Sequence, residues 1–375
     1  MAASPGRLTV ARVLLVDLER AWRGGQEQAL LLMTGLKRRG HCAELVAVRD
    51  SAIALRAQAA GIRVHATPDA GRRIGAARRV RGLLREKRFD IVYANEAHAL
   101  TAAWLARSHR HVPLVAARRV VFPLSGGAIS RARYRAAARI LAISEAVRHE
   151  LLAAGVDANR IELVPDGVEI PAPIKPEARE KARKKWAFQA DETVIECVGA
   201  LTAEKGHALL IEAFAKLRRE CANCRLLLAG EGPLRAQLER QAREAGLASA
   251  IIFAGFVSDV DSVYAAGDLF VFPSLAEGSG SSLLRAMAYG LPVLALARGG
   301  VAEIIQDGRS GVLVQEASAE DLARAAGRLL KNAELRERLS RAGRETVTSR
   351  YSVDRMVDGT ARILEKLIAE RPGKQ

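Results

Sequence analysis

Residues 269–296 read LFVFPSLAEGSGSSLLRAMAYGLPVLAL, and this stretch decides the fold class. Two short apolar runs, Leu269–Phe272 and Val293–Leu296, flank a Gly/Ser-rich turn and a helical pattern over Ser281–Tyr289. Nearly continuous apolar strands that alternate with helices are typical of a parallel sheet covered on both faces. The stretch therefore predicts one strand–helix–strand unit of an α/β domain.

The same alternation extends outward from this unit along the chain. It stops at Val164–Pro176, where four prolines disfavour helix and indicate an interdomain linker. We therefore predict two tandem doubly wound, Rossmann-like α/β domains that face a cleft. The first comprises residues 1–168 and the second residues 169–352. A helix at about 353–371 is a candidate to pack back on the first domain. The other predicted strands are Arg12–Val16, Glu44–Val48, Ile62–His65, Ile91–Tyr93, Leu114–Ala117, Ile140–Ile143, Thr193–Val198, Arg225–Ala229, Ile251–Ala254 and Gly311–Val314.

The composition fits a globular protein of two domains. The chain has 375 residues, of which 49% are hydrophobic and 27% are charged. No apolar run reaches the roughly 18 residues of a membrane-spanning helix, and the first apolar run, Val13–Val16, is too short for a signal peptide. We therefore expect a cytoplasmic protein.

The positive charge is concentrated in the first half of the chain. The net charge is +16, and residues 1–170 carry +13 of it. This asymmetry fits nucleic acid, a membrane surface or a phosphorylated acceptor, but an aromatic content of 4% disfavours nucleic acid. The basic segment Arg72–Arg88 has an apolar side that suits either an anionic inner membrane face or a core-facing stripe with a solvated basic face.

A glycine turn and a lysine follow the predicted strand Thr193–Val198. Residues 198–206 read VGALTAEKG and lead into a predicted helix. The amide groups at a helix start and the ammonium of Lys205 favour a phosphate beside Gly199. The spacing is not that of a Walker A loop, so an ordinary loop with a solvated lysine remains the alternative.

An acidic residue and a Gly/Ser loop follow the strand Leu269–Phe272. The small residues of Gly278–Ser282 let backbone amides approach a ligand closely, and the carboxylate of Glu277 suits hydrogen bonds to sugar hydroxyls. The alternative is a plain strand-to-helix turn in which the acid stabilises the helix start.

Three further features of the sequence have competing interpretations. Arg118 and Arg119 follow a strand and suit a bidentate clamp on an acceptor phosphate, or form a basic surface loop. His98 also lies just beyond a strand and is either a site residue or structural. The pair Cys221 and Cys224 has no partner pair for a metal site, which favours a structural role.

Several motifs in a fixed order resemble nucleotide-sugar glycosyltransferases of the GT-B fold, specifically glycosyltransferase family 4. The resemblance rests on residues 198–206, 230–233 (GEGP), 255–259 (GFVSD) and 274–293, and in the first half on Gly24-Gly25, ISEAV at 143–147 and VPDGV at 164–168. It implies transfer of a sugar from a nucleotide diphosphate sugar to an acceptor, with retention of anomeric configuration. It also implies no metal or other cofactor, and no cluster of His, Cys or Asp here has metal-ligand spacing.

The resemblance also implies roles for particular residues. Glu277 binds the donor sugar, while Lys205 and the backbone of Gly278–Ser282 hold the diphosphate. The segment Gly255–Val257 meets the base, and the glycine pair lets the N-terminal domain close on the phosphates. The predicted catalytic residues are Glu277, Lys205, His98 and Arg118, and the predicted acceptor ligands are Arg118 and Arg119. The predicted donor ligands are Gly24, Gly25, Gly199, Lys205, Gly255, Phe256, Val257, Glu277, Gly278, Ser279, Gly280, Ser281, Ser282 and Arg285.

The chain departs from the family pattern at two positions. Arg285 stands where the family usually has a second Glu that binds the ribose, and Ala200 stands where it often has an Arg. We predict that Arg285 faces the nucleotide and restores the charge that is missing at Ala200. A solvated arginine on the helix surface is the alternative.

These features predict a glycosyltransferase that acts on a lipid-linked or cell-envelope glycan precursor, such as one of lipopolysaccharide. The expected partners are a nucleotide-sugar donor, a glycan or lipid-linked acceptor and the anionic inner face of a membrane, but not nucleic acid. Two alternatives stay open: a nucleotide-sugar epimerase or hydrolase of the same fold, and a degenerate protein that serves as a sugar-nucleotide binder or scaffold.

Overall fold

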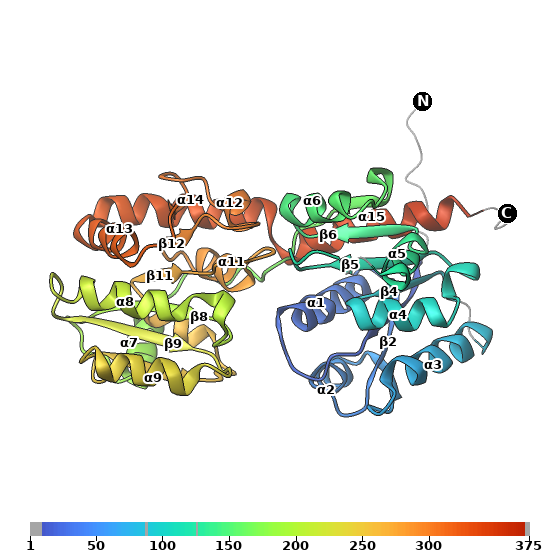
Figure 1. Ribbon diagram of the computed structural model, residues 1–375, viewed down its shortest axis with the longest axis horizontal. Helices are drawn as coiled ribbons and strands as arrows, with labels where there is room; N and C mark the ends of the chain where they lie inside the picture. Colours follow the sequence, from blue (N-terminus) through green and yellow to red (C-terminus); the bar gives the residue numbers. More distant parts are fainter. Residues whose placement is uncertain (1–9, 87–88, 125–126, 372–375) are drawn as a thin grey trace. The chain divides into compact units, whose positions relative to one another are not determined.

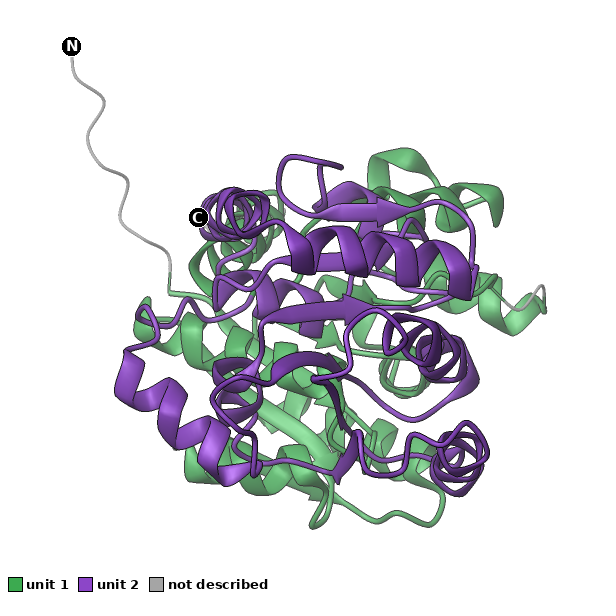
Figure 2. Cartoon of the chain, turned by 90° about the vertical axis from the view of Figure 1, so that its left-hand side faces the viewer, with its two compact units in different colours: residues 1–167, 353–375 green, residues 168–352 purple. Residues whose placement is uncertain are grey.

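The computed structural model describes residues 10–86, 89–124 and 127–371. The chain forms two compact units, residues 1–167 with 353–375 (unit 1) and residues 168–352 (unit 2), which Figure 2 colours separately. Each unit is a parallel sheet with helices on both faces, as the sequence predicts (Figure 1). Lys87 and Arg88 of the predicted basic segment lie outside the described residues.

Unit 1 contains a seven-stranded parallel sheet of order β3-β2-β1-β4-β5-β6-β7. The order reverses between β1 and β4. Strand β1 pairs in parallel with both β2 and β4, so that Leu15 lies opposite Leu45 on one side and Tyr93 on the other. The strands are β1 (Arg12–Asp17), β2 (Cys42–Val48), β3 (Arg63–Thr67), β4 (Ile91–Ala94), β5 (Leu114–Arg118), β6 (Arg139–Ala142) and β7 (Ile161–Leu163). The helices are α1 (Gly24–Arg38), α2 (Ala52–Ala59), α3 (Arg72–Glu86), α4 (Ala97–Leu105), α5 (Ala128–Arg135), α6 (Glu145–Ala153) and α15 (Val353–Ala369).

The two faces of this sheet bury different helices. Leu14 and Val16 of β1 lie in the core with α3, α4 and α6, whereas Val13 and Leu15 lie in the core with α1, α2 and α15, as the alternation of side chains along a strand requires. Gly35 of α1 lets α15 approach closely, because a Cβ there would lie 2.4 Å from Cγ2 of Val357. The C-terminal helix is therefore part of the core of unit 1.

Unit 2 repeats the topology with six strands in the order β10-β9-β8-β11-β12-β13. One core lies against α8, α9 and α13, and the opposite face lies against α7, α10, α11, α12 and α14. The strands are β8 (Thr193–Val198), β9 (Cys224–Ala229), β10 (Ile251–Gly255), β11 (Leu269–Phe272), β12 (Val293–Leu296) and β13 (Val312–Val314). The helices are α7 (Pro176–Lys185), α8 (His207–Leu217), α9 (Arg235–Glu244), α10 (Asp261–Ala266), α11 (Ser281–Ala288), α12 (Val301–Ile304), α13 (Ala319–Lys331) and α14 (Ala333–Arg350).

The predicted strands are present, and three elements that the sequence pattern did not indicate, α5, α14 and β7, are short or have weak apolar patterns. Helix α14 buries only Leu339, Gly343 and Val347, so it shows little of the apolar periodicity that identifies a helix. Strand β7 has three residues, and α5 buries only Ser130 and Tyr134. No helix in the described part of the chain is both long and apolar enough to cross a bilayer.

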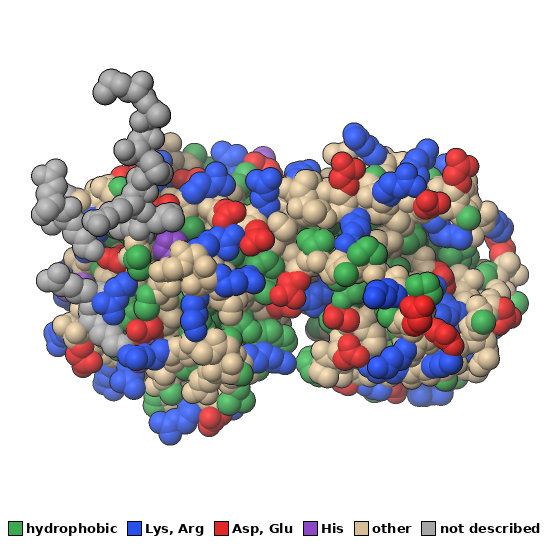
Figure 3. All heavy atoms as spheres, turned by 180° about the vertical axis from the view of Figure 1, so that it is seen from behind, with side chains coloured by type: hydrophobic (Ala, Val, Ile, Leu, Met, Phe, Trp, Pro, Cys, Tyr) green, Lys and Arg blue, Asp and Glu red, His purple; other side chains and the backbone are tan. Residues whose placement is uncertain are grey.

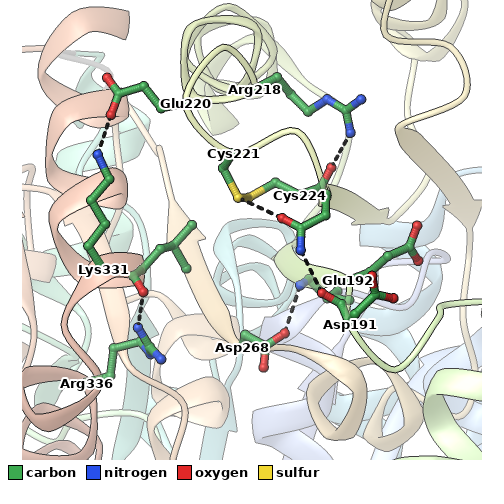
Figure 4. The surroundings of a disulfide bond; sticks show 12 residues. Asp191, Glu192, Arg218, Glu220, Cys221, Cys224, Asp268, Lys331 and Arg336 are labelled. Carbon is green, nitrogen blue, oxygen red and sulfur yellow. Dashed lines mark hydrogen bonds and ion pairs between the residues drawn. A yellow bond between two sulfur atoms is a disulfide. The ribbon is translucent and has the colours of Figure 1, made fainter.

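Cys221 and Cys224 form a disulfide in the turn between α8 and β9 (Figure 4). The turn is also closed by a hydrogen bond from the Cys224 amide to the Cys221 carbonyl at 3.1 Å. Asn223, inside the turn, donates to the Asp191 carbonyl at 2.8 Å. The disulfide thus connects the segment after α8 to the first residue of β9, which is a structural role.

Candidate active site

Both units have the topology that places ligands at a particular edge of the sheet. In doubly wound sheets, ligands bind outside the carboxyl ends of the strands where the strand order reverses. That point lies between β8 and β11 in unit 2, and between β1 and β4 in unit 1. The segments that follow these four strands carry many of the residues that the sequence singles out, among them Lys205, Glu277 and His98.

In unit 2 the structure brings two predicted donor residues together. The ammonium of Lys205, after β8, forms an ion pair with Oε2 of Glu277, after β11. The hydroxyl of Ser274 donates to the same oxygen at 3.3 Å. The side chains of Lys205 and Glu277 are 25% and 14% exposed, so both charges are partly desolvated but remain accessible to a ligand.

Glycines hold the two loops together. Gly206 has φ +69°, and a Cβ there would lie 2.0 Å from the Pro273 carbonyl oxygen. The Leu275 amide donates to the Glu204 carbonyl at 2.8 Å across the same contact. Any side chain at position 206 would therefore separate the loop of Lys205 from the loop of Glu277.

A third loop fixes the backbone of Glu277. Gly299 has φ +53°, and a Cβ there would lie 2.0 Å from the carbonyl oxygen of Glu277. The Gly300 amide donates to that oxygen at 3.1 Å. This support was not predicted from the sequence, although two glycines shortly after an apolar strand are a visible signal.

The N-terminus of α11 faces the same edge of the sheet. Gly280, at φ +94°, precedes the helix, and no side chain of the described residues caps it. The first amides of a helix lack partners within the helix and carry the positive end of its dipole. The backbone of Ser281 and Ser282 therefore suits an anion, and the buried Gly278, Ser279 and Gly280 form the turn that leads to it.

The segment predicted to meet the base lies at the end of β10, two strands from β8. The carbonyl of Gly255 accepts a hydrogen bond from Gly230 at 2.8 Å, which joins the loop to the end of β9. Phe256 is 60% exposed. An exposed aromatic ring at this edge can stack on a base.

Arg285 lies on α11, half-buried, one turn beyond Ser281. Burial raises the pKa of Tyr289, and a hydrogen bond to Asp261 and its charge raise it further. The positive charge of Arg285 acts in the opposite direction and lowers this pKa. The guanidinium therefore lies near Tyr289 and the start of α10. Ala200 is exposed in the loop after β8.

In unit 1 the corresponding edge is filled by a buried polar network. Asp17, at the end of β1, accepts hydrogen bonds from Asn95 at 2.6 Å and from Gln26 at 3.0 Å. Asn95 also donates to the Gly25 carbonyl at 3.0 Å. Burial raises the pKa of Asp17 despite these bonds. The network fixes the turn that contains Gly24 and Gly25, and the sequence analysis identified only the two glycines.

Arg119 is part of this network. Its Nε donates to Asp166 at 3.0 Å, and its Nη1 donates to the Asn95 side chain at 2.6 Å. Arg118 instead donates to the Tyr134 hydroxyl at 3.4 Å and to the Phe122 carbonyl. The two guanidiniums share no hydrogen-bond partner among the described residues, so the structure does not bring them together as one clamp.

His98 lies at the start of α4, near two carboxylates. Its Nε2 is 3.8 Å from Oε1 of Glu19, and Glu96 caps the helix by accepting from the Ala99 amide at 2.6 Å. Burial and the charge of Asp17 raise the pKa of Glu96 to about 7. In the described parts of the chain, Glu19, Glu96 and His98 are the one group whose ligand atoms lie close enough to hold a cation.

Known proteins resemble the chain in both halves. The model of Glycosyltransferase Family 4 matches residues 22–170, and that of Glycosyl transferases group 1 matches residues 178–346. The chain is 32% identical over 191 residues to alpha-D-kanosaminyltransferase of Streptomyces kanamyceticus, covering 50% of this chain and 49% of that protein. It is 32% identical over 182 residues to the lipopolysaccharide core biosynthesis glycosyltransferase LpsE of Rhizobium meliloti, covering 48% and 52%. These alignments span about half the length of the curated relatives.

A solved structure extends the likeness to the fold of the whole chain. HepE of Anabaena, crystallised with UDP and glucose, has a TM-score of 0.83 over 95% of this chain and 99% of that one, at 22% sequence identity. Two tandem doubly wound units of this kind define the GT-B fold class. Within that class, the chain consists of a Glycosyltransferase Family 4 domain in its first half and a Glycosyl transferases group 1 domain in its second half.

Proposed function

We propose that the protein transfers a sugar from a nucleotide diphosphate sugar to an acceptor, with retention of anomeric configuration and without a metal. The observation that supports this most is the Lys205–Glu277 pair beside the N-terminus of α11. The ammonium and the helix amides suit a diphosphate, and the carboxylate suits sugar hydroxyls. The UDP and glucose bound to HepE make a UDP-sugar the first donor to test.

The chemistry requires positive charge where the nucleotide leaves. Transfer breaks the bond between the anomeric carbon and the diphosphate oxygen, which gains negative charge. The acceptor hydroxyl oxygen bonds to the same face of the sugar, and its proton passes to the departing diphosphate. Lys205 and the amides of Ser281 and Ser282 are the groups that would stabilise this charge in place of a metal. Turnover should therefore survive EDTA, and a loss that Mg²⁺ or Mn²⁺ restores would contradict the metal-free mechanism.

The proposed acceptor is a lipid-linked or cell-envelope glycan precursor. The basic first half of the chain and the lipopolysaccharide core relative support this acceptor class. The kanosaminyltransferase relative supports a small-molecule acceptor as the second candidate.

A peripheral contact between unit 1 and an anionic membrane completes the proposal. Phe122 and Ile129, before and within α5, are 56% and 63% exposed, and Arg131 and Arg135 on the same helix are exposed. Basic and apolar side chains intermingle on the visible face of unit 1 (Figure 3). Each basic residue at the surface contributes about 1 kcal/mol to binding of an anionic membrane. Co-sedimentation with anionic vesicles should therefore decrease as the salt concentration increases. Equal binding to neutral vesicles would contradict this account.

The decisive experiment combines donor binding with turnover. The melting temperature is measured with UDP-, GDP-, ADP- and dTDP-sugars, since a ligand that binds only the native state raises it. The donor that binds is then incubated with and without acceptor glycans. Transfer only with an acceptor supports the proposal. Turnover without one favours the hydrolase or epimerase alternative, and binding without turnover favours the sugar-nucleotide binder.

A further inference from the structure

Three arginines converge on His98 at the carboxyl edge of the sheet of unit 1. Arg72 and Arg73 begin α3, His98 lies in the first turn of α4, and Arg133 lies on α5. Helices α3, α4 and α5 pack on the same face of the sheet (Figure 1). None of these arginines was singled out as a site residue by the sequence analysis.

Hydrogen bonds fix the positions of all three guanidiniums. Nε of Arg73 donates to Nδ1 of His98 at 3.0 Å. Nη1 of Arg72 donates to the Leu18 carbonyl at 2.9 Å, directly after β1. Nη1 of Arg133 donates to the Thr101 hydroxyl at 2.7 Å, one turn along α4 from His98. The positive charges are therefore held in place from three helices.

The contact with Arg73 determines which nitrogen of His98 carries the proton. A guanidinium only donates hydrogen bonds, so Nδ1 must accept and the neutral ring carries its proton on Nε2. Burial lowers the pKa of His98, and the charges of Arg73, Arg72 and Arg133 lower it further, against the opposing charge of Glu19. The ring is therefore neutral at neutral pH and presents an N–H group from a side chain that is 29% exposed.

This arrangement disfavours the cation that the nearby carboxylates suggest. A metal needs a lone pair on an imidazole nitrogen, but Nδ1 is engaged by Arg73 and Nε2 is protonated. Glu96 uses Oε1 to accept from the amides of Leu18 and Ala99. Three guanidiniums add further repulsion, so the donors that face this site suit an anion.

We propose that Arg72, Arg73, Arg133 and His98 form a binding site for a phosphate group of the acceptor. The assignment to the acceptor rests on the proposed function, whereas the anion site rests on unit 1 alone. Donors from three helices match a phosphate with its three or four oxygens, and arginine forks bind such oxygens in pairs. Glu19, whose carboxylate lies 3.8 Å from Nε2 of His98, is the anion that the phosphate displaces.

Two substitutions of opposite sign test the site. Inorganic phosphate and glycerol 3-phosphate are titrated by calorimetry into the full-length protein at low salt. Arg73→Gln should weaken binding about tenfold or more, the scale of a charged hydrogen bond. Glu19→Gln should tighten it, because it removes the competing carboxylate. Arg81→Gln is the matched control, since it removes the same charge from an exposed position of α3 and should change affinity less than twofold.

The same variants distinguish the source of the phosphate. If Arg73→Gln loses glycerol 3-phosphate, the site takes a soluble phosphate ester. Vesicle binding is measured with phosphatidylglycerol and, as the comparison, with phosphatidylcholine. If Arg73→Gln loses binding to phosphatidylglycerol vesicles but not to glycerol 3-phosphate, and Arg81→Gln keeps both, the phosphate is a lipid headgroup. Equal affinities in wild type, Arg73→Gln and Arg81→Gln, or no binding of any probe, would overturn the inference.

Nucleotide binding separates this inference from the proposed function. A UDP-induced rise in melting temperature measures the donor site of unit 2 in the same preparations. If Arg73→Gln still binds the nucleotide and binds phosphate as the wild type does, the anion site is overturned and the proposed function is not. Absence of binding and turnover with every nucleotide sugar overturns the proposed function and leaves the phosphate result standing.

Discussion

The two units share one strand order but use the same edge of the sheet in different ways. At the edge of unit 2, glycine loops bring backbone and two partly exposed charges, Lys205 and Glu277, to the surface. At the edge of unit 1, Asp17, Asn95 and Arg119 hydrogen-bond to one another in the interior. The same topology thus supports two kinds of edge. In unit 2 the polar groups stay accessible to a ligand, whereas in unit 1 they hydrogen-bond to one another and fix a turn. The predictions below test this difference, beginning with the largest expected effect.

Removing the buried arginine of unit 1 should destabilise the protein most. Arg119→Ala removes the guanidinium that pairs with Asp166, whose side chain is 9% exposed. Breaking a buried pair in this way costs about 3–5 kcal/mol. The free energy of unfolding in urea measures the loss. Arg20→Ala is the control, because its pair with Asp69 is about half exposed and should contribute no more than about 1 kcal/mol.

Removing either charge of unit 2 should affect turnover rather than stability. Lys205→Ala and Glu277→Ala should each lower turnover by about 10²–10³, the scale of one lost transition-state contact. Lys216→Ala on α8 is the control, since it breaks an exposed pair with Glu320 of α13 and should retain activity. Near-native turnover in either site variant would remove the donor-site assignment, whatever its stability.

Arg285 tests whether the edge of unit 2 includes a charged residue that departs from the family pattern. Arg285→Ala should weaken binding of the nucleotide diphosphate by about 1.5–3 kcal/mol, the scale of a charged hydrogen bond. Calorimetric titration measures it, with the exposed Arg324→Ala on α13 as control.

The outcomes for Arg285 separate three roles. Unchanged affinity with a lower melting temperature would make it a structural neighbour of Tyr289 and Asp261. Tighter binding in Arg285→Glu would show that the chain has lost a ribose ligand.

The difference between the two edges also explains what the sequence could predict. Glu277 and Lys205 stand in Gly-rich loops after apolar strands, and these local patterns identify both loops without the structure. The network of unit 1 joins residues such as Arg119 and Asp166 that are 47 positions apart, and no local pattern shows that they meet. The clamp predicted for Arg118 and Arg119 assumed that neighbours in sequence share a ligand. The two side chains point to different partners because successive residues at a strand end face opposite sides of the sheet.

The last expected effect is a pH dependence of stability that arises from Glu96 in unit 1. Its pKa of about 7 lies above the ordinary value of 4.5, chiefly because of burial. The folded state therefore holds the proton more tightly than the unfolded state, and ionisation removes stability as the pH rises from about 4.5 to about 7. Glu96→Gln keeps an oxygen that can cap α4 and has no such loss. Its free energy of unfolding should thus increase relative to wild type over that range, by about 3 kcal/mol for a shift of this size, and stay constant above it. Glu180→Gln should show the opposite sign, because Lys184 lowers the pKa of Glu180. Urea unfolding at pH 4.5, 6 and 8 measures all three proteins. A constant difference between Glu96→Gln and wild type would show that Glu96 has the same pKa in the folded and unfolded states, and that the edge of unit 1 is more hydrated than its hydrogen bonds indicate.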